Sequence, residues 1–248
     1  MVAFGKLGGG TPLLVRWQSD WDCGFETEWW YCIKDTPFEV SSLKSKRRYE
    51  INKGNKNFSV KKINPTDYKE DLYRVSIAAY MGWPEKYRPK VEKTAFYSQV
   101  DKWSNSDVFA GFSLETGELN GFALLTDYDK YVEFSVLRTE PETEKLAINA
   151  AMVAGILKYY ENRFDGRFYI NDGSRSIRHE TAFQDYLEKY FDFRKAYCRL
   201  NVKYKSWFGI VVRVLYPFRK HIKTESKLGS QISGVLRMEE ICRSFQRE

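Results

Sequence analysis

The chain has 248 residues, of which 43% are hydrophobic and 29% are charged. These values are sufficient for a sizeable core and exclude an extensively disordered protein. The 40 Lys and Arg residues exceed the 33 Asp and Glu residues, which gives a net charge of +7. The chain has only two histidines and its four cysteines lie far apart, so we expect no metal site.

The chain begins without a charged segment followed by an apolar one, so we expect no signal peptide. The longest apolar-rich run, residues 207–218, contains Arg213 and is too short to span a bilayer. The sequence therefore predicts a cytoplasmic protein with reduced thiols.

Basic residues are concentrated in two segments. Residues 44–62 hold eight Lys and Arg residues against one acid, and residues 203–227 hold seven against one. This surplus favours contact with phosphates or with an anionic surface. No motif that interleaves aromatic and basic residues accompanies it, so we predict no specific nucleic-acid partner.

The first half of the chain predicts an accessory segment followed by alternating elements. Residues 1–40 contain a Gly-rich start and two strands, 13–17 and 29–33. A helix over 42–53 should end at Gly54, a strand follows over 58–63, and Asn64-Pro65 should open a helix that reaches residue 80. A further helix over 90–103 precedes three strands, 108–114, 121–126 and 131–137.

The second half predicts a buried helix over 142–163, because its middle has no charged residue and is rich in alanine. A strand over 168–170, a helix over 178–190 and a strand over 193–204 follow. The order β-α-α-β-β-β-α-β-α-β indicates an α/β fold of the mixed (α+β) kind, with one mixed sheet flanked by helices. We assign it to residues 41–205, and residues 206–248 to a basic amphipathic helical tail.

This order resembles the GNAT acyltransferase fold over residues 42–204. Residues 42–53 look like the basic opening helix of the FemAB-like branch. Residues 179–194 resemble the late helix of the superfamily, with His179 at the place of its Asn, then Ala182 and Tyr186 at the spacing of its Ala and Tyr. The resemblance implies an N-acetyltransferase-like enzyme that transfers an acyl group to an amine.

The resemblance also implies where the acyl donor lies. The donor would pair with strand backbone at Val136 and Leu137, where the fourth and fifth strands diverge, and its pyrophosphate would sit at the start of the next helix. There the family motif corresponds to Lys145, Ala147 and Asn149, and His179 would be a further contact. Acetyl-CoA or another acyl-CoA is the implied donor. Aminoacyl-tRNA remains an alternative donor, because Glu142 and Glu144 would repel the pyrophosphate of coenzyme A.

Three residues are candidates for catalysis. Strand alternation puts Glu133 and Ser135 on one face and Val132, Phe134 and Val136 on the other. Glu133 could deprotonate the acceptor amine, and Asp172 at the end of the fifth strand is the alternative base. Tyr186 occupies the place of the tyrosine that protonates the leaving group, although Tyr190 competes for it.

The acceptor predicted from family habit is an amino sugar or a cell-envelope precursor. Sugar rings could stack on the tryptophans at positions 29, 30, 83 and 103. The apolar residues and cations of 207–223 predict either an interfacial helix on the inner face of an anionic membrane or a helix packed against protein. The rival reading is a catalytically silent GNAT-like module that binds a membrane or a polyanion.

Overall fold

A computed structural model describes residues 2–4, 12–85, 88–177, 182–222, 224 and 226–245. The chain forms two compact units. The larger unit comprises residues 33–173 and 186–193, and the smaller one comprises residues 1–32, 174–185 and 194–248. The structure therefore groups the N-terminal segment with the C-terminal helices, whereas the sequence predicts three consecutive segments.

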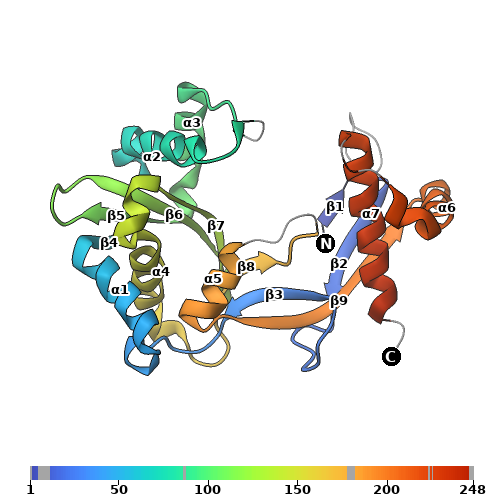
Figure 1. Ribbon diagram of the computed structural model, residues 1–248, viewed down its shortest axis with the longest axis horizontal. Coiled ribbons are helices and arrows are strands. Elements are labelled where there is room, and N and C mark those ends of the chain that lie inside the picture. The colour runs from blue at the N-terminus through green and yellow to red at the C-terminus, as the bar shows by residue number, and fades with distance from the viewer. Residues whose placement is uncertain are drawn as a thin grey trace. The chain divides into compact units, whose positions relative to one another are not determined.

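The larger unit contains a mixed sheet with the strand order β4-β5-β6-β7-β8 (Figure 1). The pairs β4–β5, β5–β6 and β6–β7 are antiparallel, and β8 runs parallel to β7. The strands span β4 Phe58–Ile63, β5 Asp107–Ser113, β6 Leu119–Asp127, β7 Tyr131–Thr139 and β8 Tyr169–Ser174. This arrangement confirms the predicted fold class and the order of its elements.

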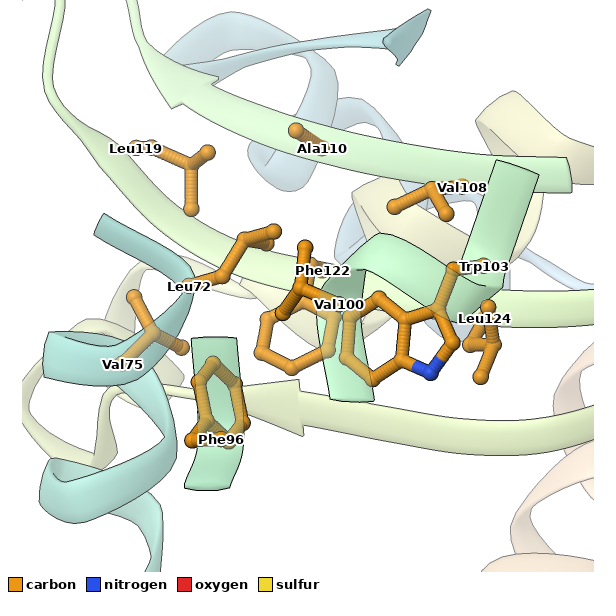
Figure 2. Close-up of a cluster of buried hydrophobic side chains, with 10 residues drawn as sticks. All are labelled: Leu72, Val75, Phe96, Val100, Trp103, Val108, Ala110, Leu119, Phe122 and Leu124. Carbon is orange, nitrogen blue, oxygen red and sulfur yellow. The ribbon is translucent and has the colours of Figure 1, made fainter. Parts of the chain in front are cut away.

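Helices cover both faces of this sheet. One face carries α2 (Lys69–Met81), preceded by the short helix η2 (Pro65–Tyr68), and α3 (Lys93–Val100), followed by η4 (Asp101–Asn105). Figure 2 shows the core beneath them, where Leu72, Phe96 and Trp103 converge on Phe122 of β6. The opposite face carries α4 (Ile148–Tyr159), with α1 (Ser45–Asn57) packed against it and the short helix η1 (Val40–Ser42) just before α1.

Two glycines allow α1, α4 and the sheet to approach closely. A Cβ atom on Gly155 of α4 would lie 2.6 Å from the Cβ atom of Val60 in β4. A Cβ atom on Gly54 of α1 would lie 2.6 Å from the carbonyl oxygen of Ala147. The predicted end of α1 at Gly54 is wrong, because this glycine serves helix packing and α1 continues to Asn57.

The predicted helix over 142–163 is divided in the structure. A short helix, η5 (Pro141–Leu146), comes first, Ala147 then adopts a left-handed conformation with φ of 64°, and α4 begins at Ile148. After α4 the chain forms η6 (Glu161–Arg163). The α4 segment itself is buried, as predicted.

In the smaller unit, β1 (Val2–Phe4) pairs with β2 (Leu14–Ser19) and β2 pairs with β9 (Arg194–Tyr204), both antiparallel. Helix α6 (Ser206–Leu215), η7 (Tyr216–His221) and α7 (Lys227–Ser244) follow β9. Strand β3 (Trp29–Lys34) and helix α5 (Ala182–Phe191) contribute residues to both units. No helix in the described ranges is long and apolar enough to cross a membrane.

Candidate functional site

Strands β7 and β8 pair over only part of their lengths. The pairs are Tyr131 with Tyr169, Val132 with Ile170 and Glu133 with Asn171, although β7 continues to Thr139. Strand β8 turns away at Gly173, whose φ of 93° favours glycine, and the side-chain oxygen of Asn171 accepts a hydrogen bond from the Gly173 N–H at 2.8 Å. The edge of β7 after Glu133 is therefore not paired with β8.

A β-bulge at Ser135 changes the alternation of β7. Leu124 of β6 is opposite Val136 and Leu125 is opposite Phe134, so Ser135 is the extra residue. Val136 consequently packs into the core beneath α2 and α3, while Phe134 lies on the α4 face. The prediction that Phe134 and Val136 share a face is wrong for this reason.

Glu133 lies on the same face as α2 and α3. Its partner in β6 is Thr126, and the neighbouring Leu125 is on the α4 face with Phe134, so Thr126 and Glu133 are on the other face. The Glu133 side chain is partly buried. Burial raises the pKa of the Glu133 carboxyl above its usual range. The hydroxyl oxygens of Thr126 and Ser135 lie 3.3 Å apart beside it. Glu133 is thus a carboxylate with increased basicity at the point where β7 and β8 separate.

Three stacked tyrosines lie along the strands next to Glu133. The ring centroids of Tyr131 and Tyr169 are 5.1 Å apart with an angle of 6° between the rings, and those of Tyr128 and Tyr131 are 4.8 Å apart. Burial, and then the charge of the nearby Glu133, raise the pKa of Tyr131 above its usual range. Tyr128 is half exposed, so the stack presents an open aromatic surface.

Asp172 and Tyr186 lie elsewhere. Asp172 follows Asn171, the in-register partner of Glu133, so alternation places it on the opposite face of the sheet. Tyr186 of α5 contacts the rings of Tyr190 and Phe191. Burial, together with the charge of Glu50 in α1, raises its pKa far above the usual range, so the hydroxyl stays protonated. Because Glu133 and Asp172 do not share a face, they are alternatives for the base and not a pair.

The residues predicted to hold the donor are spread over β7 and the start of α4. Val136 and Leu137 lie in the part of β7 that is not paired with β8. Ala147 is buried at the left-handed turn, Asn149 accepts a hydrogen bond from the Thr139 hydroxyl at 3.1 Å, and Lys145 is exposed. His179 lies outside the described residues.

The start of α4 fits a coenzyme A pyrophosphate only in part. The N-cap residue Ala147 provides no side-chain hydrogen bond, so the first N–H groups of the helix are not capped by it. Glu142 and Glu144 precede the helix, and Lys145 is the basic residue of η5. The backbone suits an anion, whereas the net charge of the adjoining side chains opposes one.

Arg138 is a residue that the sequence analysis missed. This arginine of β7 is partly buried under α2, where it donates a hydrogen bond to the Ser76 hydroxyl at 3.0 Å and lies 4.6 Å from the ring centre of Tyr80. Burial lowers the pKa of its guanidinium, and it forms no ion pair with the described residues. Arg138 lies opposite Phe122 of β6. This position could have identified the residue, but only with the strand pairing known.

Other sequence candidates have structural roles. Trp29 and Trp103 are buried in two separate cores, so they cannot stack on a sugar. In the basic segment 44–62, Arg47 forms an ion pair with Asp192 and Lys62 with Asp107. The described residues contain no group of three or more His, Cys, Asp or Glu side chains that could hold a metal ion.

Comparisons with known proteins establish the fold. No protein-family model matches the chain, and no curated protein matches its sequence. Among solved structures, the chain is similar to L-PGS from Bacillus licheniformis, with 14% identity, a TM-score of 0.55, and coverage of 86% of this chain and 69% of the other. It is also similar to the C-terminal domain of a putative lysylphosphatidylglycerol synthetase from Agrobacterium fabrum, with 12% identity, a TM-score of 0.50, and coverage of 82% and 67%. The fold is GNAT-like.

Proposed function

We propose that the chain is an acyltransferase that acylates an amine. The observation that carries this proposal is the end of the β7–β8 pairing at Glu133, a carboxylate whose pKa burial raises. The part of β7 beyond its pairing with β8 offers backbone N–H groups to an acyl group, and Glu133 lies where that part begins.

In the proposed reaction Glu133 takes the proton of the acceptor amine, whose nitrogen then forms a bond to the acyl carbon. Backbone N–H groups of β7 stabilise the negative charge on the acyl oxygen. The bond to the donor's leaving group breaks, and this group takes up a proton from solvent. Tyr186, the proton donor predicted from the sequence, packs on Tyr190 and Phe191 away from Glu133, so it has no role in this step.

For the acceptor we propose an amino sugar or a related cell-envelope precursor. Sugars bind flat against aromatic rings, and the stack of Tyr128, Tyr131 and Tyr169 offers such a surface next to Glu133. The hydroxyl groups of Thr126 and Ser135 can bond to sugar hydroxyls on the same face.

For the donor we propose an acyl-CoA, with aminoacyl-tRNA as the competing outcome of the test. The Ala147 side chain does not cap the first N–H groups of α4, which favours a phosphate-bearing donor, while Glu142 and Glu144 oppose one. The similar Agrobacterium protein is named a putative lysylphosphatidylglycerol synthetase. That name refers to lysyl, which is an aminoacyl group, and to phosphatidylglycerol, which is a phospholipid. This analogy rests on the fold, so it supports acyl transfer without selecting the donor.

The test measures binding and turnover separately. The full chain is screened against acetyl-CoA, longer acyl-CoAs and aminoacyl-tRNA by thermal shift, because a bound ligand raises the unfolding temperature. Turnover with amino-sugar acceptors is then compared for the wild type, Glu133→Gln and the control Glu118→Gln, whose carboxylate is exposed between β5 and β6.

Glu133→Gln should lower kcat by about 10²-fold or more while the dissociation constant of the donor stays the same, because a general base contributes to the chemical step and not to donor binding. Glu118→Gln should match the wild type. Binding of no donor, or full turnover by Glu133→Gln, contradicts the proposal and favours the silent module.

A further inference from the structure

Helix α6 of the smaller unit has two apolar faces, and only one of them is covered. Its inner face, with Phe208 and Val212, packs with Tyr216 and with Leu236 of α7. In Figure 1 α6 lies beside α7 at the margin of this unit. The inner face is sufficient to hold the helix on its own unit, so the outer face requires a separate explanation.

The outer face of α6, together with η7, carries five large apolar side chains that are each 40–62% exposed. We call them the apolar band, and they are Trp207, Ile210, Val211, Val214 and Phe218. At 3.6 residues per turn, the four members in α6 fall within an arc of about 100°. Isolated exposed apolar residues are ordinary, but a continuous row of this kind indicates a binding surface.

Within the described ranges, the charges around the apolar band that no ion pair neutralises are positive. No acidic residue occurs between Asp192 and Glu225. Arg213 and Lys220 are exposed and form no ion pair with the described part of the chain. The acids of α7 are neutralised, since Glu239 pairs with Arg243 at 2.8 Å and Glu240 pairs with Arg219 at 3.0 Å.

We propose that α6 and η7 attach the protein to the surface of an anionic lipid bilayer through the apolar band. An interfacial helix inserts aromatic and branched side chains beneath the headgroups while cations beside it contact anionic lipids, and α6 has both features. The exposed cations Arg213 and Lys220 complement an anionic surface, and a bilayer offers such a surface together with an apolar interior for the apolar band. The inference does not depend on the proposed acyl transfer.

The binding depends on two contributions that can be separated. The apolar contribution is insensitive to salt, while the charge contribution is screened over about 8 Å at physiological ionic strength. Attachment should therefore weaken as salt rises but persist while the apolar band is inserted. It should also be weaker on vesicles without anionic lipid.

The test is co-sedimentation of the full chain with vesicles of equal parts phosphatidylcholine and phosphatidylglycerol, and with phosphatidylcholine alone. The double variant Ile210→Ser with Val214→Ser should lower the partition coefficient by about tenfold or more, since both side chains leave water on binding. Arg213→Glu with Lys220→Glu should lower it by at least about tenfold at low salt, with a smaller effect at high salt.

The matched control is Leu228→Ser in α7, an equally exposed apolar residue outside the apolar band. It should bind vesicles like the wild type. Circular dichroism should show the same unfolding temperature for all variants, because the substituted side chains are exposed.

Three results overturn the proposal. The first is that the wild type does not pellet with anionic vesicles. The second is that the Ile210→Ser/Val214→Ser variant pellets as well as the wild type. The third is that neutral vesicles bind the protein as tightly as anionic ones. Sedimentation velocity without lipid tests whether a second copy of the chain, and not a bilayer, covers this surface. A wild-type dimer that the double variant converts to a monomer, together with no vesicle binding, would assign the band to an interface between two copies of the chain.

Discussion

Substitution of Gly54 by alanine tests the packing that positions the start of α4. The new Cβ atom would lie 2.6 Å from the Ala147 carbonyl oxygen and 2.9 Å from the Ala151 nitrogen, whereas ordinary contact begins at 3.4 Å. Both neighbours are backbone atoms, so α1 and α4 must separate. Overpacking costs about 1–3 kcal/mol, and the upper part of this range, about 2–3 kcal/mol, applies because backbone atoms cannot rotate away. The higher helix propensity of alanine offsets about 1 kcal/mol. We expect a net loss of about 1–2 kcal/mol.

For a chain of this size the loss corresponds to a decrease in unfolding temperature of about 2–8 °C, measured by circular dichroism. Gly209→Ala in α6 is the matched control, because its Cβ atom would lie 3.4 Å from the Cβ atom of Tyr204. This variant should be as stable as the wild type or slightly more stable. A Gly54→Ala protein that unfolds at the wild-type temperature or above would refute the close approach of the two helices.

Three further substitutions test the core, the candidate base and a helix cap. Leu72→Ala should cost about 2–5 kcal/mol in urea unfolding, because Leu72 is fully buried in the cluster of Figure 2. Glu133→Gln should raise the unfolding temperature at pH 7, since the raised pKa means that the charged form is disfavoured in the folded state. This gain should disappear below about pH 4, where the carboxyl is protonated in both states. Ser226→Ala should cost about 1 kcal/mol in thermal unfolding, because its hydroxyl accepts the Gly229 N–H at 3.0 Å and caps α7.

Much of the fold could be predicted from local patterns. Asn64 accepts a hydrogen bond from the Thr66 N–H, and Pro65 begins η2, as the Asn-Pro pair predicts. The left-handed Ala147 was not predictable, since a non-glycine residue in this conformation leaves no compositional signal. Pairing of β2 with β9 joins residues from opposite ends of the chain, so a local reading assigns them to separate segments.

The candidate site was less predictable because it depends on register. Glu133 could be selected as a carboxylate in an apolar strand, and its partial burial supports that choice. Its position relative to Asp172, however, follows from the pairing of Glu133 with Asn171. The stack of Tyr131 on Tyr169 has the same origin, because it joins residues of two strands separated by α4 in the sequence.

The hydrophobic pattern of β7 does not need the bulge at Ser135, but the bend of the strand beside the candidate site does. With Ser135 removed, the rest of β7 would form an unbroken alternation in which Val136 and Glu133 keep their present faces. The sheet could therefore dispense with this residue. The insertion bends β7 directly beside the point where it leaves β8, and a shortened strand would keep its hydrophobic pattern while losing that bend. Strand length, and not residue identity alone, thus sets the geometry around the candidate base.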